Sequence, residues 1–234
     1  MMKKITEDVE VTEEVSTSEI YVSPDETPIT HCILHNSVKI LVDTLNDEEN
    51  EMLVPPLLNE RNATGKSPLE LCAILGRTDI MRELLSKGAD VNLANCEGYT
   101  PAHYASAWGQ VAVLKILTEF GADLTITNIR SESPKDIAQR YGKVECIDFI
   151  DWAFAKESLL ARIKAIQDVL IEPEKKPSRE EKNLIINSCK EKLAWVENTP
   201  TATTQEFISQ QVALDTALSA VLSKVTKNLN KSTV

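Results

Sequence analysis

The stretches SPLELCA (Ser67–Ala73), TPAHYAS (Thr100–Ser106) and SPKDIAQ (Ser133–Gln139) follow one another at a constant spacing, with their first residues at positions 67, 100 and 133. Each opens with a Ser or Thr, which can cap a helix, followed by a Pro, whose missing N–H is harmless in a first helical turn. A fixed period of this length indicates a repeat array in which each unit buries its apolar face only against its neighbours. We therefore predict that a helix begins at each Ser/Thr–Pro pair.

Glycines fall in the same register and mark the expected ends of these first helices at positions 76, 109 and 142. After the first two comes a second helix that ends in LLSKGADVN (84–92) or ILTEFGADLT (116–125). This combination of period and anchor positions resembles the ankyrin repeat. The resemblance implies an all-α solenoid of helical hairpins that binds proteins through its hairpin tips and concave face.

The third repeat is incomplete, because Ser131 replaces a Gly, Lys135–Asp136 replaces a more apolar pair, and no GAD follows its second helix. Instead, no Gly or Pro occurs between Lys143 and Glu172, and apolar residues recur at helical spacing. The sequence predicts one long helix that ends the array and continues into the next domain. The array would then hold two full repeats and one incomplete one, within residues 31–154.

Before the array, the apolar spacing of His31–Leu45 predicts one amphipathic helix, which we interpret as a degenerate N-terminal cap. Residues 1–60 hold 14 Asp and Glu against three Lys, whereas the remainder balances 22 acidic against 22 basic residues. Residues 1–30 are acidic, mix in Ser, Thr and Pro, and show no sustained period. We expect them to form a disordered acidic tail.

A helical bundle is predicted for residues 155–228, followed by a flexible terminus at 229–234. Ser178 and Glu181 form a capping-box pattern that opens a helix over 178–198, and Thr203 and Glu206 open another. The last helix carries a near-heptad stripe in which Gln211 is the one polar residue. Together with the end of the long helix, these two helices make a three-helix bundle.

The run from Asn187 to Phe207 is similar to the helical lid of DnaK-type heat-shock chaperones. Trp195–Val196, Asn198 and Glu206–Phe207 match that family's pattern of a helix end, a short loop and a new helix start. The resemblance implies a co-chaperone or holdase-like regulator as an alternative function. It does not imply ATP-driven folding, because the chain has no room for the nucleotide domain or the client-binding β-sandwich of those chaperones.

Composition excludes several classes of protein. Apolar residues make up 42% and charged residues 26%, as in soluble globular proteins, and the net charge of −11 disfavours nucleic-acid binding. The five cysteines are odd in number and widely spaced, which indicates reduced thiols. With neither a signal peptide nor a membrane span apparent, we expect a cytoplasmic protein, with cytoskeletal and nuclear sites and the oligomeric state left open.

The sequence offers little for catalysis, and we predict no enzyme and no cofactor. It lacks phosphate-binding loops, a G-x-S-x-G motif and an H-E-x-x-H motif. His31 and His35 could share a helix face beside Cys32 and bind zinc, but a structural site needs four ligands, so an incidental pair is the favoured interpretation. His103 stands at the T-P-x-H place, where the resemblance implies hydrogen bonds to neighbouring repeats.

Partner binding is the predicted function, as an adaptor or scaffold without catalysis. Leu75, Trp108 and Tyr141 recur at the same repeat period, and the ankyrin resemblance places them in a row on the concave face. The alternative, left open, is that these side chains only cover the seam between repeats. The tips of the hairpins add the candidates Glu97, Tyr99, Arg130 and Glu132. A strut in a cytoskeletal assembly is a third hypothesis.

Overall fold

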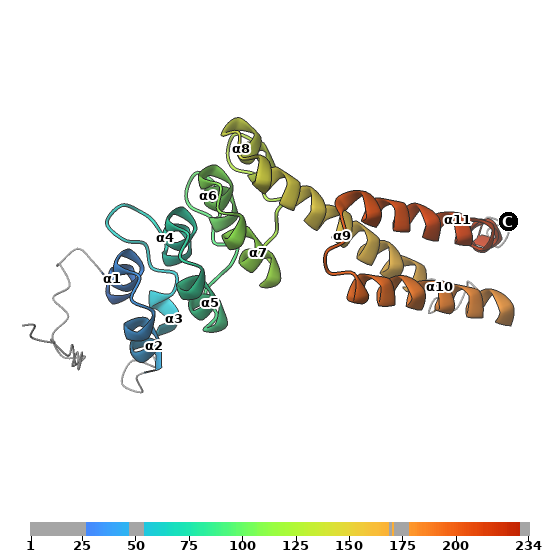
Figure 1. The fold of residues 1–234 in the computed structure, drawn as a ribbon, viewed down its shortest axis with the longest axis horizontal. Coiled ribbons are helices and arrows are strands. Elements are labelled where there is room, and N and C mark those ends of the chain that lie inside the picture. The colour runs from blue at the N-terminus through green and yellow to red at the C-terminus, as the bar shows by residue number, and fades with distance from the viewer. Residues whose placement is uncertain (1–26, 47–53, 169, 171–177, 230–234) are drawn as a thin grey trace, which may run out of the picture.

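The structure is a computed structural model that describes residues 27–46, 54–168, 170 and 178–229. Figure 1 shows helical hairpins stacked side by side at one end of the molecule and a bundle of long helices at the other. One helix, α9 (Val144–Asp168), belongs to both parts. Every regular element in these residues is a helix, which confirms the predicted all-α repeat fold.

Three hairpins begin at the predicted Ser/Thr–Pro pairs. They are α4 (Pro68–Leu75) with α5 (Thr78–Ser86), α6 (Pro101–Trp108) with α7 (Val111–Glu119), and α8 (Pro134–Arg140) with α9. Ser67 and Ser133 accept hydrogen bonds from backbone N–H groups of the first turn, as N-caps do. Gly76 and Gly109 end α4 and α6 with φ values of 69° and 75°, as predicted.

The first helices stack on one another, and so do the second helices (Figure 1). Three small residues in equivalent repeat positions, Cys72, Ala105 and Ala138, are fully buried on α4, α6 and α8. Their small side chains let the helices approach closely. Larger side chains such as Leu84 and Leu114 fill the space between first and second helices. Truncating one of these to Ala typically lowers stability by about 2–5 kcal/mol.

The N-terminal part of the array is a hairpin, so the single helix predicted for His31–Leu45 is wrong. α1 (Pro28–His35) and α2 (Val38–Asn46) are separated at Asn36, which has a φ of 55°. Asn tolerates this left-handed conformation and ends α1 as glycines end α4 and α6. Thr27 caps α1 by accepting a hydrogen bond from the N–H of Thr30. Within the described residues the array therefore holds four hairpins, and a short helix, α3 (Val54–Leu57), precedes α4.

Because α1 begins at Pro28, the last residues of the expected disordered tail are helical. Residues 1–26, which make up the rest of that tail, lie outside the described residues. Residues 171–177, which precede the helix predicted over 178–198, and residues 230–234 of the expected flexible terminus also lie outside them.

The long helix predicted after Lys143 is present as α9 and serves two cores in turn. Its first half buries Cys146, Ile150 and Ala153 in the core of the repeat array. Its second half buries Leu159 and Ile163 in a separate core. A continuous helix shared by two cores couples the two parts of the molecule, as the absence of Gly and Pro predicted.

The second core lies in the three-helix bundle of α9, α10 (Arg179–Asn198) and α11 (Thr204–Leu229). Ser178 and Glu181 form the predicted capping box at the start of α10. Phe207 is fully buried, and Trp152 and Trp195 meet its ring edge-on at centroid distances of 6.0 and 5.3 Å. Aromatic pairs prefer such geometry, and the cluster fixes the base of the bundle against α9.

Candidate protein-interaction surface

Leu75, Trp108 and Tyr141 end successive first helices and reach the surface. Leu75 and Trp108 are the last residues of α4 and α6, and Tyr141 follows α8 as its C-cap. Their side chains are 39%, 58% and 55% exposed. Because α4, α6 and α8 stack side by side, these three residues occupy equivalent places on neighbouring helices. We call them the first-helix row.

Sequence reasoning missed a fourth member of this register. His35 ends α1 just before the left-handed Asn36, as Leu75 ends α4 just before Gly76, and it is exposed. Its ring lies 4.3 Å from that of His31, centroid to centroid. The Thr27–Pro28 pair was the available signal, but it precedes Ser67–Pro68 by more than one repeat period. A search at the fixed period therefore passed over it.

A row of asparagines at the same period builds the hairpin tips. The side-chain oxygen of Asn62 accepts hydrogen bonds from the backbone N–H groups two and four residues on, at 3.0 and 2.9 Å. Asn95 and Asn128 repeat both contacts at 2.8–3.0 Å. Such Asx contacts replace backbone partners that a tight turn lacks. The tips are thus held in one shape, a role that the periodic spacing of these asparagines could have revealed.

The four candidate residues at the hairpin tips differ in solvent exposure and in their contacts with the rest of the chain. Glu97 and Arg130 are exposed, whereas Tyr99 and Glu132 are partly buried. The Tyr99 ring lies 5.5 Å from that of His103, and the Glu132 carboxylate accepts a hydrogen bond from Arg140 at 2.7 Å. Tyr99 and Glu132 therefore hold neighbouring elements together, and Glu97 and Arg130 are the better placed for a partner.

His103 joins two repeats, as the ankyrin resemblance implied. Its Nδ1 accepts a hydrogen bond from the Thr100 N–H at 3.1 Å, which leaves the hydrogen on Nε2 to donate to the Glu132 carbonyl, also 3.1 Å away. Burial holds the pKa of His103 below its ordinary value, because the charged imidazolium would lose its water. The buried imidazole has a structural role in its neutral form.

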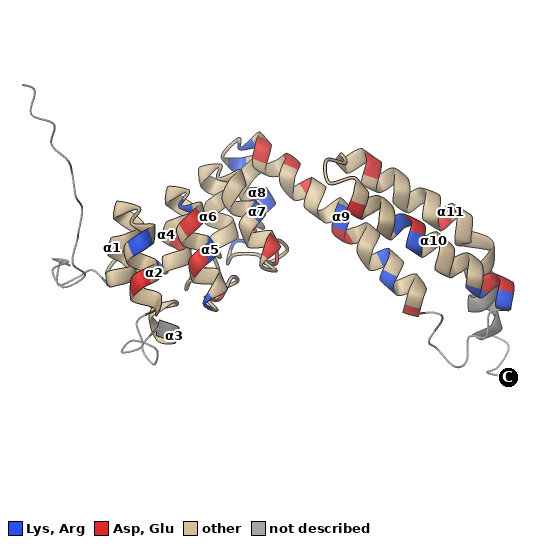
Figure 2. Cartoon of the chain, turned by 60° about the horizontal axis from the view of Figure 1, so that its bottom comes forward, with Lys and Arg blue, Asp and Glu red and all other residues tan. Residues whose placement is uncertain are grey.

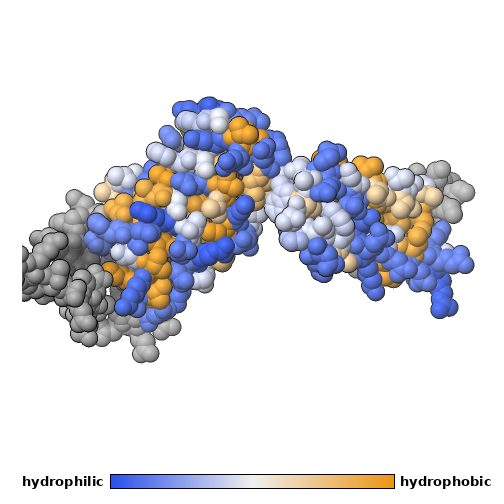
Figure 3. All heavy atoms as spheres, in the orientation of Figure 1, coloured by the Kyte–Doolittle hydropathy of each residue, from blue (hydrophilic) through white to orange (hydrophobic). Residues whose placement is uncertain are grey.

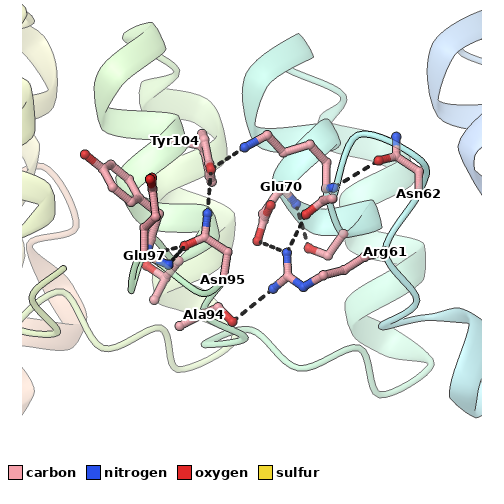
Figure 4. Close-up of polar contacts among 12 residues, drawn as sticks. Arg61, Asn62, Glu70, Ala94, Asn95, Glu97 and Tyr104 are labelled. Atoms are coloured by element: carbon pink, nitrogen blue, oxygen red, sulfur yellow. Dashed lines mark hydrogen bonds and ion pairs between the residues drawn. The ribbon is translucent and has the colours of Figure 1, made fainter. Parts of the chain in front are cut away.

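Glu70 occupies the position of His103 one repeat earlier and is fully buried. Arg61 reaches it with an N–O distance of 2.8 Å and also donates to the carbonyl of Ala94 in the next tip (Figure 4). Desolvation raises the pKa of the Glu70 carboxyl, and Arg61 works against that rise. Beside this pair, the Tyr104 hydroxyl meets Lys66 and Asn95, so two tips and α6 form one network.

The histidine and cysteine candidates for a metal site do not come together with further ligands in the described part of the chain. Its His, Cys, Asp and Glu residues include no group of three that could hold a metal ion, and Cys32, beside the histidine pair, is buried. Burial raises the pKa of Cys32, Cys72 and Cys189, and that of Cys146 to about 11, so these thiols are poor nucleophiles at neutral pH.

Comparison with known proteins places the chain in a family. A model of ankyrin repeats in three copies matches residues 7–95 and 46–128. Ankyrin repeat domain-containing protein 45 of Mus musculus is 45% identical over 206 residues, which span 86% of this chain and 83% of the relative. The chain belongs to the family of ankyrin repeat domain-containing protein 45.

Two further relatives carry the same name. The protein of Homo sapiens is 32% identical over 212 residues, which span 87% of this chain and 80% of that protein. The protein of Danio rerio is 39% identical over 84 residues, and that match spans 38% of its length. The first ankyrin match begins before α1, in agreement with an array that includes the α1–α2 hairpin. The similarity of α9–α11 to a chaperone lid stays a prediction.

Ankyrin-repeat proteins are typically non-catalytic interaction modules, and this membership carries the coarse functional conclusion. Lys, Arg, Asp and Glu are spread over both the array and the bundle (Figure 2), so the surface as a whole does not single out one type of charge in a partner. No helix in the described ranges is long and apolar enough to cross a membrane.

Proposed function

We propose that this protein is an adaptor whose first-helix row binds one partner protein while its bundle is free to engage another. The observation that carries the proposal is the exposure of Leu75, Trp108 and Tyr141 at equivalent helix ends. Trp and Tyr dominate the energetics of many interfaces because they bury a large area with little loss of rotamer freedom. Trp108 and Tyr141 are both more than half exposed, so much of each residue remains available to a partner.

The scaffold beneath the row is rigid, which favours binding by preorganisation. Buried small side chains let the first helices pack closely, and the asparagines hold each tip in shape. Arg61 joins two successive hairpins by donating to the Ala94 carbonyl of the next tip. The exposed tip residues Glu97 and Arg130 would add polar contacts at the rim of the same interface. We place the adaptor's two units at 28–154 and 155–228, which moves the start predicted at residue 31 to the beginning of α1, in keeping with the two separate cores along α9.

Proximity labelling in cells tests the proposal. The full chain is compared with the double variant Trp108→Ala/Tyr141→Ala and with the control Leu184→Ala/Ile208→Ala, which removes exposed apolar side chains from α10 and α11. We expect a small set of neighbours that the row variant loses and the control keeps, with both variants folded by circular dichroism. Identical neighbours for all three proteins would contradict a role for the row.

A co-chaperone or holdase-like role is the second candidate, favoured by apolar exposure on the bundle. Leu184, Ile186, Ile208 and Val212 are 38–59% exposed on α10 and α11. Figure 3 shows hydrophobic residues at the surface of both the array and the bundle. Contiguous exposed apolar side chains mark binding surfaces in soluble proteins. If the Leu184→Ala/Ile208→Ala variant loses chaperones or unfolded clients from the labelled set, the co-chaperone role of the bundle is favoured over the adaptor role of the first-helix row.

A further inference from the structure

A groove of about 1350 Å³ lies where the repeat array meets the bundle, away from the first-helix row. Three parts of the chain line it: α7 from Val111 to Glu119 with the turn at 121–125, α9 from Glu145 to Leu160, and the segment at 200–204 that joins α10 to α11. Small-molecule sites usually measure about 300–1000 Å³. The groove is therefore of a size for a segment of polypeptide.

The floor of the groove is apolar and fixed. Phe149 and Trp152 stack on α9 with ring centroids 5.7 Å apart. Leu160 is exposed farther along α9, whereas Leu124 and Ala153 line the groove but are themselves buried. The indole N–H of Trp152 donates to the Ala202 carbonyl at 2.8 Å, which ties α9 to the α10–α11 connection. The polar edge of the indole is thus satisfied within the chain. The Lys156 ammonium lies 5.1 Å from the centroid of the Trp152 ring, so an occupant would contact the apolar floor beside this lysine.

The rim of the groove is acidic. Five carboxylates line it against two lysines, Lys115 and Lys156; the carboxylates belong to Glu119, Asp123, Glu145, Asp148 and Glu157. Figure 2 shows acidic residues along the first half of α9. In a cleft with low-dielectric walls, an excess of one sign concentrates the field and attracts the opposite charge.

Four of these carboxylates form no ion pair within the described residues. Glu119 pairs with Arg82 at 2.8 Å, and Asp123 accepts hydrogen bonds from Thr125. Glu145, Asp148 and Glu157 make no ion pair within the described ranges of the chain. Glu145 and Asp148 are three residues apart on α9, where like charges destabilise a helix by a few tenths of a kcal/mol. This repulsion would be relieved by a cationic occupant.

We propose that this groove binds a basic amphipathic segment of a partner protein, with Lys or Arg at the rim and large apolar side chains on the Phe149–Trp152 floor. The acidic rim disfavours three other occupants of the groove: nucleic acid, residues 1–26 of this chain, and a second copy of the chain. Nucleic acid is anionic, and residues 1–26 of this chain hold eight Asp and Glu against two Lys. A second copy of the chain would bring a formal charge of −11.

The test uses the full chain and a labelled 18-residue peptide with Lys on its polar face and Leu and Trp on its apolar face. The groove variant is Asp148→Lys/Glu157→Lys, and the matched control is Glu191→Lys/Glu197→Lys on α10, which changes the net charge equally outside the groove. At 150 mM salt, where charges more than about 8 Å apart are screened, we expect at least a tenfold loss of affinity in the groove variant and less than a twofold change in the control.

Hydrogen exchange locates the bound peptide, and we expect slowed exchange in 145–160 and 200–204. A peptide with Glu in place of every Lys should not bind. Equal affinity for both peptides, or equal losses in the two variants, would overturn the proposal, as would no binding at all. The row variant Trp108→Ala/Tyr141→Ala should keep the peptide affinity, so failure of this site and failure of the first-helix row are distinguishable.

Discussion

The repeats that begin with α4 and α6 each connect a buried polar side chain to the next hairpin tip, a charged one in the first repeat and a neutral one in the second. The third residue of the first helix is buried in both and must connect to the next tip. In the α6 repeat it is His103, a neutral ring that donates to the Glu132 carbonyl. In the α4 repeat it is Glu70, a carboxylate that connects through Arg61 to the Ala94 carbonyl.

The partner position changes together with the buried residue. Arg61 lies one repeat period before Ala94, so the α6 repeat has an alanine where the α4 repeat has the arginine. A buried imidazole needs no counter-charge, whereas a buried carboxylate is costly unless it is paired. The same position in the repeat therefore accommodates either a neutral or a charged side chain, but only the charged one, Glu70, needs a side chain of opposite charge, Arg61.

Removing Arg61 from its pair with Glu70 should give the largest loss of stability among these predictions. Arg61→Ala leaves Glu70 buried and unpaired, and removal of one partner of a buried pair destabilises by about 3–5 kcal/mol. We expect a loss near the lower end, because the Arg61 side chain is itself partly exposed. Urea unfolding followed by circular dichroism measures it.

The double variant Arg61→Ala/Glu70→Gln is the control, because it removes the stranded charge and should recover part of the loss. If the double variant is as unstable as Arg61→Ala, the effect comes from the lost hydrogen bonds to Gly65 and Ala94 and not from the unpaired carboxylate.

The tips of the two repeats also differ, although their glycines share one conformation. Gly65 and Gly98 have φ values of 74° and 79°, and an Ala at either site is strained by about 1–2 kcal/mol. A Cβ at Gly98 would also lie 2.9 Å from the Asn128 Cα, whereas one at Gly65 meets nothing within 4 Å. We expect Gly98→Ala to destabilise by about 1–3 kcal/mol more than Gly65→Ala in urea unfolding, because the next tip must shift. Equal losses would show that the two tips are not in tight contact.

Much of the array could be predicted because its signals are local and periodic. Ser67–Pro68 and Gly76 fix the ends of α4 by capping and backbone conformation, and the same residue types recur one repeat later. The α1–α2 hairpin was not predicted because Asn36 replaces the glycine that ends the first helix in other repeats, and because the spacing to the next repeat is longer. In both cases the physics of the helix end is the same, and only its signature in the sequence changes.

The contacts that join distant segments could not be predicted in this way. Arg61 and Glu70 come together through the fold of one tip against the next. The groove depends on Trp152 meeting Ala202, which lies 50 residues later. The positions of the first-helix row were predictable from the register, and their exposure needed the structure.

The pH dependence of stability should separate the two buried residues by sign. The pKa of His103 is lowered from 6.5 by burial, so the unfolded chain takes up the proton first and stability falls as the pH drops below about 6.5. The pKa of Glu70 is raised from 4.5, so the folded chain takes up the proton first and stability rises as the pH falls through that raised pKa towards 4.5.

Between pH 7.5 and 5, His103→Gln should therefore make the loss of stability shallower than in the wild type, and Glu70→Gln should make it steeper. Each unit of pKa shift contributes at most about 1.4 kcal/mol. Urea midpoints at four pH values measure both slopes, with His31 and His35 unchanged in all three proteins. Parallel slopes would mean that neither group titrates differently on folding.

The smallest effect on stability belongs to the exposed ends of the same two helices. Leu75→Ala and Trp108→Ala remove side chains that are 39% and 58% exposed, and surface changes of this kind shift the free energy of unfolding by less than about 1 kcal/mol. Tyr104→Phe, four residues before Trp108, removes a hydroxyl bonded to Lys66 and Asn95 and should destabilise by about 1 kcal/mol. Partner capture should reverse this order, because Trp108→Ala removes an anchor and Tyr104→Phe leaves the surface unchanged. If Trp108→Ala instead destabilises more than Tyr104→Phe and spares the partner, the indole belongs to the seam between repeats, and the adaptor must bind elsewhere.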